Sequence, residues 1–272
     1  MKQGDHNVLG YEGKRVLVVG GATGMGAAAA KKVAELGAEV TVLDVADVNF
    51  PVKEFIKIDL RDKASVDAVI EQLKGPFQAV FSCAGVADGT RGIMLINFIA
   101  QRRLLEGLVA KGALPRGSAI GVISSTAGSN WREHVPQLKE FFAIPDWDGQ
   151  AKWVEAHKSD NYLENADGYM FSKRAMSAWV AQQAYPLLKK GIRINAILPG
   201  PTDTPLARAN ADIWLAYASD YRADVGIKHL QPEEMADALI YLCSPMATGV
   251  TGENMIVDQG YTSSLILGSF GA

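Results

Sequence analysis

The 272-residue chain, with 48% hydrophobic and 21% charged residues, has the composition of an ordinary globular protein. Its net charge of −3 and the absence of a basic run argue against nucleic acid or an anionic membrane surface as a partner. The polar start, the lack of an apolar stretch near the roughly 20 residues of a membrane span, and two distant cysteines, Cys83 and Cys243, predict a cytoplasmic protein with reduced thiols.

Short apolar runs alternate with helical patterns along most of the chain. The runs are rich in β-branched residues and lack polar alternation, which is typical of strands buried on both faces of a parallel sheet. The alternation predicts a single α/β domain over 1–272, a doubly wound parallel sheet of about seven strands in three layers. The expected strands are 15–20, 39–44, 55–59, 78–83, 118–124, 192–198 and 254–258.

Two segments depart from this alternation. Residues 45–54 are too short and too polar for a packed helix, so we expect a loop there. Residues 126–168 form a long excursion that contains Trp131, Trp147 and Trp153. Because structureless loops of that length are uncommon in compact domains, we expect a small helical insertion with two short helices.

The first expected strand leads directly into a glycine-rich turn. Gly20, Gly24 and Gly26 form the pattern G-x-x-x-G-x-G and precede an alanine-rich helical segment. Such a turn brings bare backbone to a helix N-terminus, where free N–H groups and the helix dipole favour a pyrophosphate. A glycine-rich turn without a ligand is the alternative. The position between the first strand and the first helix favours nucleotide binding.

Acidic residues follow at the ends of the next strands. At Asp44, the end of the second, a carboxylate accepts hydrogen bonds from both ribose hydroxyls of an adenosine and repels a 2′-phosphate. Its neighbours are not basic, so NAD is favoured over NADP, and a solvated strand-end carboxylate is the alternative. Asp59, at the end of the third strand, is a candidate to bind the adenine. Residues 82–85 are expected to wall the ribose, with Cys83 as a packing residue.

These motifs and those that follow resemble the short-chain dehydrogenase/reductase family over roughly 14–262. The segments GGATGMG, CAG, ISSTAG, YMFSK, INAILPGPTDTPL and TGENMIVDQG are similar to its motifs, in the same order. The enoyl-reductase variant, with a lysine seven positions after the tyrosine, does not fit, because Met176 stands there. A short second crossover and a long stretch between Ser125 and Tyr169 are similar to the branch of bacterial 3α-hydroxysteroid dehydrogenase/carbonyl reductases and coniferyl alcohol dehydrogenase.

The resemblance implies a Rossmann-type fold and NAD-dependent interconversion of an alcohol and a ketone or aldehyde. It places the cofactor against the glycine turn, the ends of three strands and the segment after the sixth strand. The implied cofactor-binding residues are Gly20, Thr23, Gly24, Met25, Gly26, Asp44, Asp59, Leu60, Cys83, Ala84, Gly85, Tyr169, Lys173, Pro199, Gly200, Thr202 and Thr204.

Tyr169 and Lys173 lie one helical turn apart. A free tyrosine is mostly neutral at pH 7, so a nearby cation is needed to stabilise a phenolate. The resemblance makes Tyr169 the general base for oxidation, Ser125 the group that binds the substrate oxygen, and Asn97 the residue that orders a proton-relay water. Ser124 is the alternative to Ser125, because strand alternation points only one of them at the cleft. A structural bond to backbone is the alternative for Asn97.

A second pair, Tyr185 and Lys189, has the same spacing. It lies more than four turns later, roughly 24 Å along the same expected helix. Pro186 and Gly191 beside it indicate an approaching helix end. We therefore predict that this pair takes no part in the chemistry.

The resemblance places a mobile substrate lid at 205–231, where Trp214 and Tyr217 are candidate substrate residues. Trp131 is a third candidate, because the 126–168 insertion is expected to shape an apolar, aromatic pocket. Helix packing and a subunit contact are the alternatives. The expected substrate is a bulky cyclic or aromatic alcohol, of the steroid, terpenoid or phenylpropanoid type. The four histidines have no paired spacing, so no metal site is predicted.

The resemblance also implies a homodimer or homotetramer that assembles through the helix beginning at Tyr169. The insertion is expected to obstruct that surface and leave a dimer. A non-catalytic NAD-binding regulator on the same fold is the alternative function. It is disfavoured because Ser125, Tyr169, Lys173 and Asn97 are all present.

Overall fold

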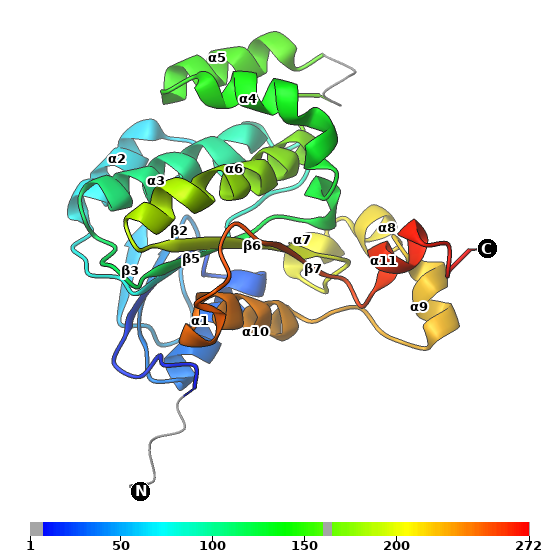
Figure 1. The fold of residues 1–272 in the computed structure, drawn as a ribbon, viewed down its shortest axis with the longest axis horizontal. Coiled ribbons are helices and arrows are strands. Elements are labelled where there is room, and N and C mark those ends of the chain that lie inside the picture. The colour runs from blue at the N-terminus through cyan, green and yellow to red at the C-terminus, as the bar shows by residue number, and fades with distance from the viewer. Residues whose placement is uncertain (1–7, 160–164, 272) are drawn as a thin grey trace, which may run out of the picture.

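The computed structural model describes residues 8–159 and 165–271. At its centre lies one sheet of seven parallel strands in the order β3-β2-β1-β4-β5-β6-β7 (Figure 1). The predicted doubly wound parallel sheet is confirmed. The strands are β1 (Arg15–Val19), β2 (Glu39–Asp44), β3 (Glu54–Lys57), β4 (Ala79–Ser82), β5 (Ala119–Ile123), β6 (Arg193–Pro199) and β7 (Asn254–Val257).

Five of the seven strands, β1, β3, β4, β5 and β7, end one or two residues earlier than the sequence pattern predicts, and in two of them the residues beyond the strand show why. β3 ends at Lys57, so Asp59 lies in the loop beyond it, and β5 ends at Ile123, so Ser125 caps the 3-10 turn η2 (Thr126–Gly128). In both loops the side chain accepts a hydrogen bond from the backbone N–H two residues on. Such local side-chain bonds compete with the sheet ladder, which explains the shorter strands.

Helices cover both faces of the sheet (Figure 1). One face carries α1 (Gly24–Glu35) and α10 (Pro232–Cys243), whose apolar residues share one core with that side of the strands. The other carries α2 (Lys63–Gln72), α3 (Ala100–Ala110) and α6 (Tyr169–Lys189), which pack in a second core.

The topology fixes where a ligand can bind. β1 pairs with β2 on one side and with β4 on the other, so the chain switches direction across the sheet at β1. In such sheets, ligands bind at the carboxyl ends of the strands beside that switch. The loops that follow these strands carry the glycine turn and most of the predicted site residues.

The segment 126–168 contains a second 3-10 turn, η3 (Trp131–His134), and the helices α4 (Val135–Ala143) and α5 (Trp147–His157). They lie outside α3 and α6 (Figure 1). Their contact is an aromatic cluster, in which Phe141 and Trp153 of the insertion lie 5.6 and 5.7 Å, centroid to centroid, from Phe171 of α6. Residues 160–164 of the predicted insertion lie outside the described residues.

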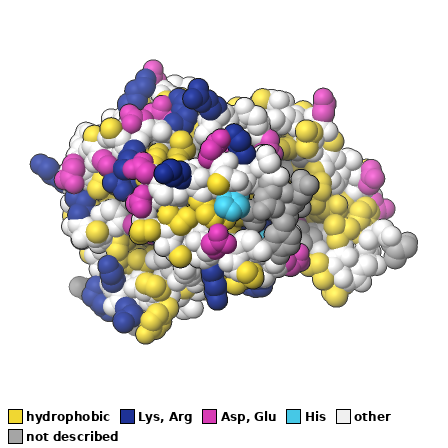
Figure 2. All heavy atoms as spheres, turned by 90° about the horizontal axis from the view of Figure 1, so that it is seen from above, with side chains coloured by type: hydrophobic (Ala, Val, Ile, Leu, Met, Phe, Trp, Pro, Cys, Tyr) yellow, Lys and Arg dark blue, Asp and Glu magenta, His cyan; other side chains and the backbone are white. Residues whose placement is uncertain are grey.

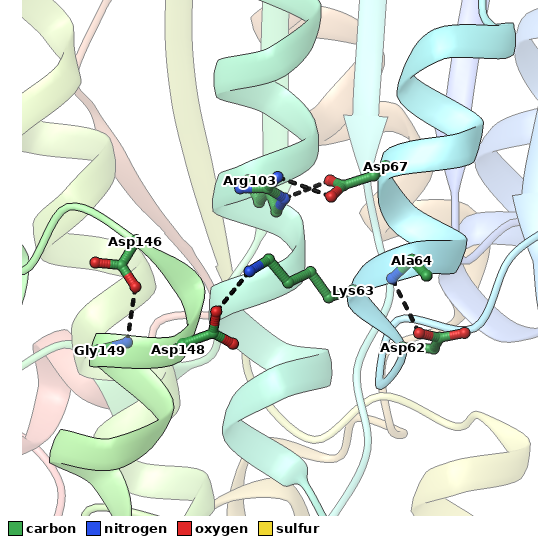
Figure 3. A network of polar contacts seen from close by, with 8 residues as sticks. All are labelled: Asp62, Lys63, Ala64, Asp67, Arg103, Asp146, Asp148 and Gly149. Atoms are coloured by element: carbon green, nitrogen blue, oxygen red, sulfur yellow. Dashed lines mark hydrogen bonds and ion pairs between the residues drawn. The ribbon is translucent and has the colours of Figure 1, made fainter.

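Polar contacts hold α5 beside α2 (Figure 3). Lys63 at the start of α2 forms an ion pair with Asp148 of α5 at 2.6 Å. Asp146 caps α5 by accepting a hydrogen bond from the Gly149 N–H at 2.9 Å. The outer surface of this region carries acidic and basic side chains interspersed with apolar ones (Figure 2). The insertion is therefore an integral part of this side of the domain.

A smaller lobe is formed by α7 (Pro205–Arg208), α8 (Ala211–Trp214), α9 (Ser219–Val225) and α11 (Tyr261–Ile266). It lies beyond the carboxyl ends of β6 and β7 (Figure 1). Tyr261 packs its ring against Tyr217 and Tyr221, each at a centroid distance of 5.3 Å. The C-terminal segment thus holds the predicted lid region from outside the cavity described below.

Candidate active site

One cavity of about 860 Å³ lies at the carboxyl edge of the sheet. This volume is near the upper end of the range for small-molecule sites, roughly 300 to 1,000 Å³. Its walls come from the glycine turn, the loops after β2 to β6, the start of α6, and the lid segments α7 and α8. The cavity therefore joins the predicted cofactor residues to the predicted catalytic ones.

The glycine turn is shaped for a close approach of a ligand to backbone. Gly20 and Gly24 have φ values of +75° and +56°, which favour glycine. A Cβ added to Gly26 would lie 2.0 Å from the carbonyl oxygen of Gly20, so no side chain fits there. The N-cap residue of α1, Thr23, makes no side-chain cap. The N–H groups at the start of α1 are thus left to an anion.

At the other end of the cofactor region, Asp44 accepts hydrogen bonds from the N–H groups of Ala22 at 2.8 Å and Ala46 at 3.0 Å. Both bonds hold the carboxylate at the edge of the cavity, which it lines. Asp59 also lines the cavity, and Arg61 pairs with it through Nε and Nη2 at 3.0 and 2.9 Å. This hydrogen-bonded pair lowers the pKa of Asp59.

Arg61 is a cavity residue that the sequence analysis missed. The signal was an arginine two positions after an acidic residue that follows a strand. A guanidinium is the usual partner of a 2′-phosphate. Because two of its guanidinium nitrogens already donate hydrogen bonds to the Asp59 carboxylate, Arg61 is not free for that contact in this structure.

Tyr169 is the first residue of α6, and Lys173 follows one turn later, with its Nζ 5.4 Å from the centre of the tyrosine ring. Lys173 is 4% exposed, and its Nζ donates a hydrogen bond to the Ile123 carbonyl at 3.3 Å. Burial lowers the pKa of Lys173 to about 8, which leaves the side chain mostly protonated at pH 7.

Burial keeps the Tyr169 side chain in its neutral form near neutral pH. Burial raises the pKa of Tyr169 to about 12, whereas hydrogen bonding with the Ser125 side chain lowers it and the charge of Asp88 raises it. Ser125 lines the cavity and faces this phenol. Ser124 is 2% exposed, and its hydroxyl bonds with the Lys173 carbonyl and the Ser177 hydroxyl at 2.9 and 2.8 Å. The geometry therefore leaves Ser125 as the serine available to a ligand.

Asn97 lies in a π-helical turn, η1 (Leu95–Ile99), before α3. Its amide accepts a hydrogen bond from the Val86 N–H at 2.8 Å and donates to the Val86 carbonyl at 3.0 Å and to the Ser172 hydroxyl at 3.1 Å. These bonds clamp the loop after β4 to α6. The side chain thus makes the structural bonds to backbone that were its alternative and does not line the cavity, while its role in ordering a relay water stays a prediction.

Asp88 is a second residue that the sequence analysis missed. Its Oδ1 accepts a hydrogen bond from the backbone N–H of Tyr169 at 2.7 Å. Gly168, the N-cap of α6, has no side chain to do so. A carboxylate is favoured at this end of a helix. Asp88 lines the cavity, so the loop after β4 both fixes the start of α6 and places a negative charge beside Tyr169.

The remaining predicted cofactor residues are brought together at the same cavity. Cys83 also packs there, and burial raises the pKa of its thiol, as expected for a packing residue rather than a nucleophile. The others that line it are Leu60, Ala84, Gly85, Pro199, Gly200, Thr202 and Thr204. The Thr204 hydroxyl accepts a hydrogen bond from the Ala207 N–H at 3.0 Å and so caps α7.

The predicted substrate residues divide into two groups. Trp214 and Tyr217 line the cavity, and the Trp214 ring lies 4.9 Å from that of Tyr169, centroid to centroid. Trp131 does not line it, and neither do Trp147 and Trp153. These three pack against the core of α3 and α6, where burial of large rings stabilises the insertion. The expectation that the insertion tryptophans shape the pocket is therefore wrong.

The second Tyr–Lys pair gives a direct comparison. Lys189 Nζ lies 5.4 Å from the Tyr185 ring centre, the same separation as in the first pair. Tyr185, however, is 72% exposed and lies away from the cavity. The helix α6 runs through Pro186 to Lys189 before it ends. The same four-residue spacing thus places lysine and tyrosine at the same distance in both pairs, although the second pair does not line the cavity.

Within residues 8–159 and 165–271, no three metal-ligating side chains gather into a cluster. None of the helices described there has the length and apolar character needed to cross a membrane. The cytoplasmic location predicted from the sequence stays a prediction.

The fold and this cavity define a dinucleotide-binding α/β protein, and comparisons identify the family. A model described as enoyl-(acyl carrier protein) reductase matches residues 149–262, and one described as the NAD dependent epimerase/dehydratase family matches 16–129. Among curated proteins, the cis-4-hydroxycyclohexanecarboxylate dehydrogenase of Sinomonas cyclohexanicum is 31% identical over 92% of this chain and 97% of its own. The chain belongs to the short-chain dehydrogenase/reductase family.

Two further curated relatives match over similar lengths. The coniferyl-alcohol dehydrogenase of a Pseudomonas strain is 26% identical, covering 93% of this chain and 98% of its own. The 3-alpha-hydroxysteroid dehydrogenase/carbonyl reductase of Comamonas testosteroni is 27% identical, covering 90% and 95%.

Solved structures agree on the fold. The 3-alpha-hydroxysteroid dehydrogenase of Pseudomonas sp. B-0831, complexed with NADH, has a TM-score of 0.75 at 24% identity and covers 93% of this chain and 98% of its own. The protein BdcA, complexed with NADPH, has a TM-score of 0.63 at 21% identity and covers 91% and 94%. The structural neighbours therefore include proteins with each of the two cofactors.

Proposed function

We propose that this protein is an NAD-dependent oxidoreductase that interconverts an alcohol and a ketone or aldehyde. The observation that carries the proposal is the convergence of Ser125, Tyr169 and Lys173 on a cavity that also contains the glycine turn. A regulator that only binds a dinucleotide has no need for a serine, a tyrosine and a buried lysine in contact beside it.

The residues present fit a dinucleotide. A pyrophosphate fits the bare backbone at Gly20 and Gly26, where added side chains would collide with the chain itself, and the uncapped start of α1 supplies N–H donors. Asp44 lies at the edge of the same cavity, where a carboxylate suits adenosine ribose hydroxyls. Thr202 and Thr204, on the loop between β6 and α7, also line the cavity, and Thr204 lies beside Gly24 of the glycine turn.

When bound, the nicotinamide ring supplies the hydride acceptor for oxidation and the donor for reduction. The chain's own residues handle the proton and the oxygen. Tyr169 takes the hydroxyl proton of an alcohol, or returns one to a carbonyl oxygen, and Lys173 stabilises the phenolate that this requires. The Ser125 hydroxyl donates a hydrogen bond to the substrate oxygen as charge develops there.

We propose a bulky cyclic or aromatic substrate, of the steroid, terpenoid or phenylpropanoid type. The support is the apolar and aromatic lining at the lid side of the cavity, where Ile213, Trp214 and Tyr217 line it and the Trp214 ring packs against that of Tyr169. Met170 and Leu206 also line the cavity. The three curated relatives described above are named for a cyclohexane, an aryl allylic and a steroid alcohol.

The proposal is tested by following NADH absorbance with the purified protein, NAD⁺ and a panel of steroid, terpenoid and aryl alcohols. We expect turnover with at least one class, and kcat/KM for NAD⁺ at least about 10-fold above that for NADP⁺, because Asp44 repels a 2′-phosphate. If no alcohol of the panel is oxidised and NADH still binds tightly, the result would instead favour the non-catalytic regulator.

The Asp44→Ala variant is the control for cofactor choice. It should reduce the NAD⁺ preference by about 10-fold, because the like-charge repulsion is removed. An unchanged ratio would show that a group other than the Asp44 carboxylate sets the preference.

We further propose that the protein is a homodimer. The insertion helices pack over α6 through Phe141 and Trp153, which contact Phe171. They therefore occupy much of the surface through which the family is expected to form tetramers. Light scattering of the purified protein should give the mass of two chains, and a mass of four chains would contradict the proposal.

A further inference from the structure

The charges that line the cavity are unevenly distributed. We define the Tyr169 end of the cavity as the lining residues from the loop after β4, the 125–130 turn, the start of α6, and the lid. In the described part of the chain, Asp88 is the only charged side chain among these apart from Lys173. The other lining charges, Asp44, Asp59 and Arg61, belong to the loops after β2 and β3.

Neither lining cation is free to bind an anionic substrate. The Arg61 guanidinium is paired with the Asp59 carboxylate through two hydrogen bonds. Lys173 is buried beneath Tyr169, donates to the Ile123 carbonyl, and is needed to support the phenolate.

Basic side chains of the lid are also engaged away from the cavity. Arg208 pairs with Asp203 at 2.6 Å, and Arg222 donates to the carbonyls of Tyr217 and Leu215. Neither arginine lines the cavity. In the described part of the chain, the lid residues that line the cavity are apolar or aromatic, and no basic side chain of the lid is among them.

We propose that the substrate of this enzyme is an uncharged alcohol or ketone, and that Asp88 makes the site reject substrates that carry a carboxylate. The inference rests on the proposed function, because it concerns the same site. It separates this chain from its 31% identical relative, whose name specifies a hydroxycyclohexanecarboxylate.

Two physical effects disfavour the binding of a carboxylate substrate. A carboxylate that enters this end of the cavity finds hydroxyl and amide groups but no cation free to pair with it, so its lost hydration is only partly replaced. Asp88 adds repulsion, and its position is fixed by the 2.7 Å hydrogen bond that its Oδ1 accepts from the Tyr169 N–H. The charge is therefore held beside the reacting group rather than left to swing into solvent.

The test compares two substrates that differ by one charge and one methyl group, cis-4-hydroxycyclohexanecarboxylate and its methyl ester, with NAD⁺ at neutral pH. We expect kcat/KM for the ester to exceed that for the acid by at least about 100-fold. A value for the acid equal to or above that for the ester would overturn the proposal.

A charge series at one position isolates the role of Asp88. Asp88→Asn and Asp88→Lys change the charge in two steps, and each step should raise the acid-to-ester ratio of kcat/KM by about 3- to 10-fold. Any disturbance of the Tyr169 contact affects both substrates and cancels in the ratio. A ratio that stays constant along the series would show that Asp88 does not select against charge.

The outcome can be separated from failure of the proposed function. If neither the acid nor its methyl ester is oxidised, the proposed function fails for cyclohexanol substrates. Binding of the two compounds is then measured instead. Isothermal titration calorimetry with the acid and with the ester, in the presence of NADH, then gives the same comparison. Stronger binding of the ester supports the inference, and equal or stronger binding of the acid contradicts it.

Discussion

Replacing Tyr169 with phenylalanine should lower kcat for alcohol oxidation by about 100- to 10,000-fold, the range for loss of a positioned acid–base group. The change removes one oxygen and keeps the ring, which packs 4.9 Å from that of Trp214. The cofactor walls do not depend on that oxygen, so the dissociation constant of NADH, measured by fluorescence, should stay within a few-fold of wild type.

The matched control is Tyr185→Phe on the same helix. Both tyrosines have a lysine Nζ 5.4 Å from the ring centre, but Tyr185 is 72% exposed and lies outside the cavity. We expect its kcat and KM to equal those of the wild type within error. Comparable losses in both variants would mean that the pair geometry acts through the stability of α6 and not through chemistry.

Replacing Lys173 with methionine should lower kcat at pH 7 by about 100-fold, because the phenolate loses its cation. Burial raises the pKa of Tyr169 to about 12, so the tyrosine needs this help to lose its proton near neutral pH. Oxidation uses the deprotonated tyrosine, and its rate therefore rises with pH. Without the lysine this rise should move to higher pH, and the deficit should shrink as the pH is increased from 6 to 10.

Lys189→Met serves as the control, since it removes the equivalent cation from the exposed pair. Its pH profile should match that of the wild type. A Lys173→Met profile with the same midpoint as the wild type, only lower, would indicate that Lys173 holds the ligand and does not tune Tyr169.

Much of the fold and the cofactor region followed from local patterns. The apolar runs that gave β1 and β2 lie within one residue of the strands observed, and the glycine turn lies where it opens α1. Ser125 was favoured over Ser124, and the structure ties the Ser124 hydroxyl to Lys173 and Ser177. Such predictions succeed because strand burial and helix spacing repeat over a few residues.

Side chains on loops and insertions were harder to place. The tryptophans of the insertion were expected at the pocket, but their rings found more burial against α3 and α6. The Asn97 amide is bonded to Val86 and Ser172, partners that the sequence did not indicate, and its role in a proton relay stays a prediction. In each case, the side chain contacts residues of another helix or loop. A pattern in the sequence does not show which helix or loop will lie next to that side chain after folding.

The sequence by itself determined the doubly wound sheet, the turn for a pyrophosphate, and the spacing of Tyr169 and Lys173, because each depends on residues close together in the chain. Only the tertiary structure decided that the insertion tryptophans pack away from the cavity, and that Asp88, which lies 81 positions before Tyr169, accepts a hydrogen bond from its N–H. The physical reason is that burial and charge at a site are set by contacts between distant segments, which form only when the helices have packed on the sheet.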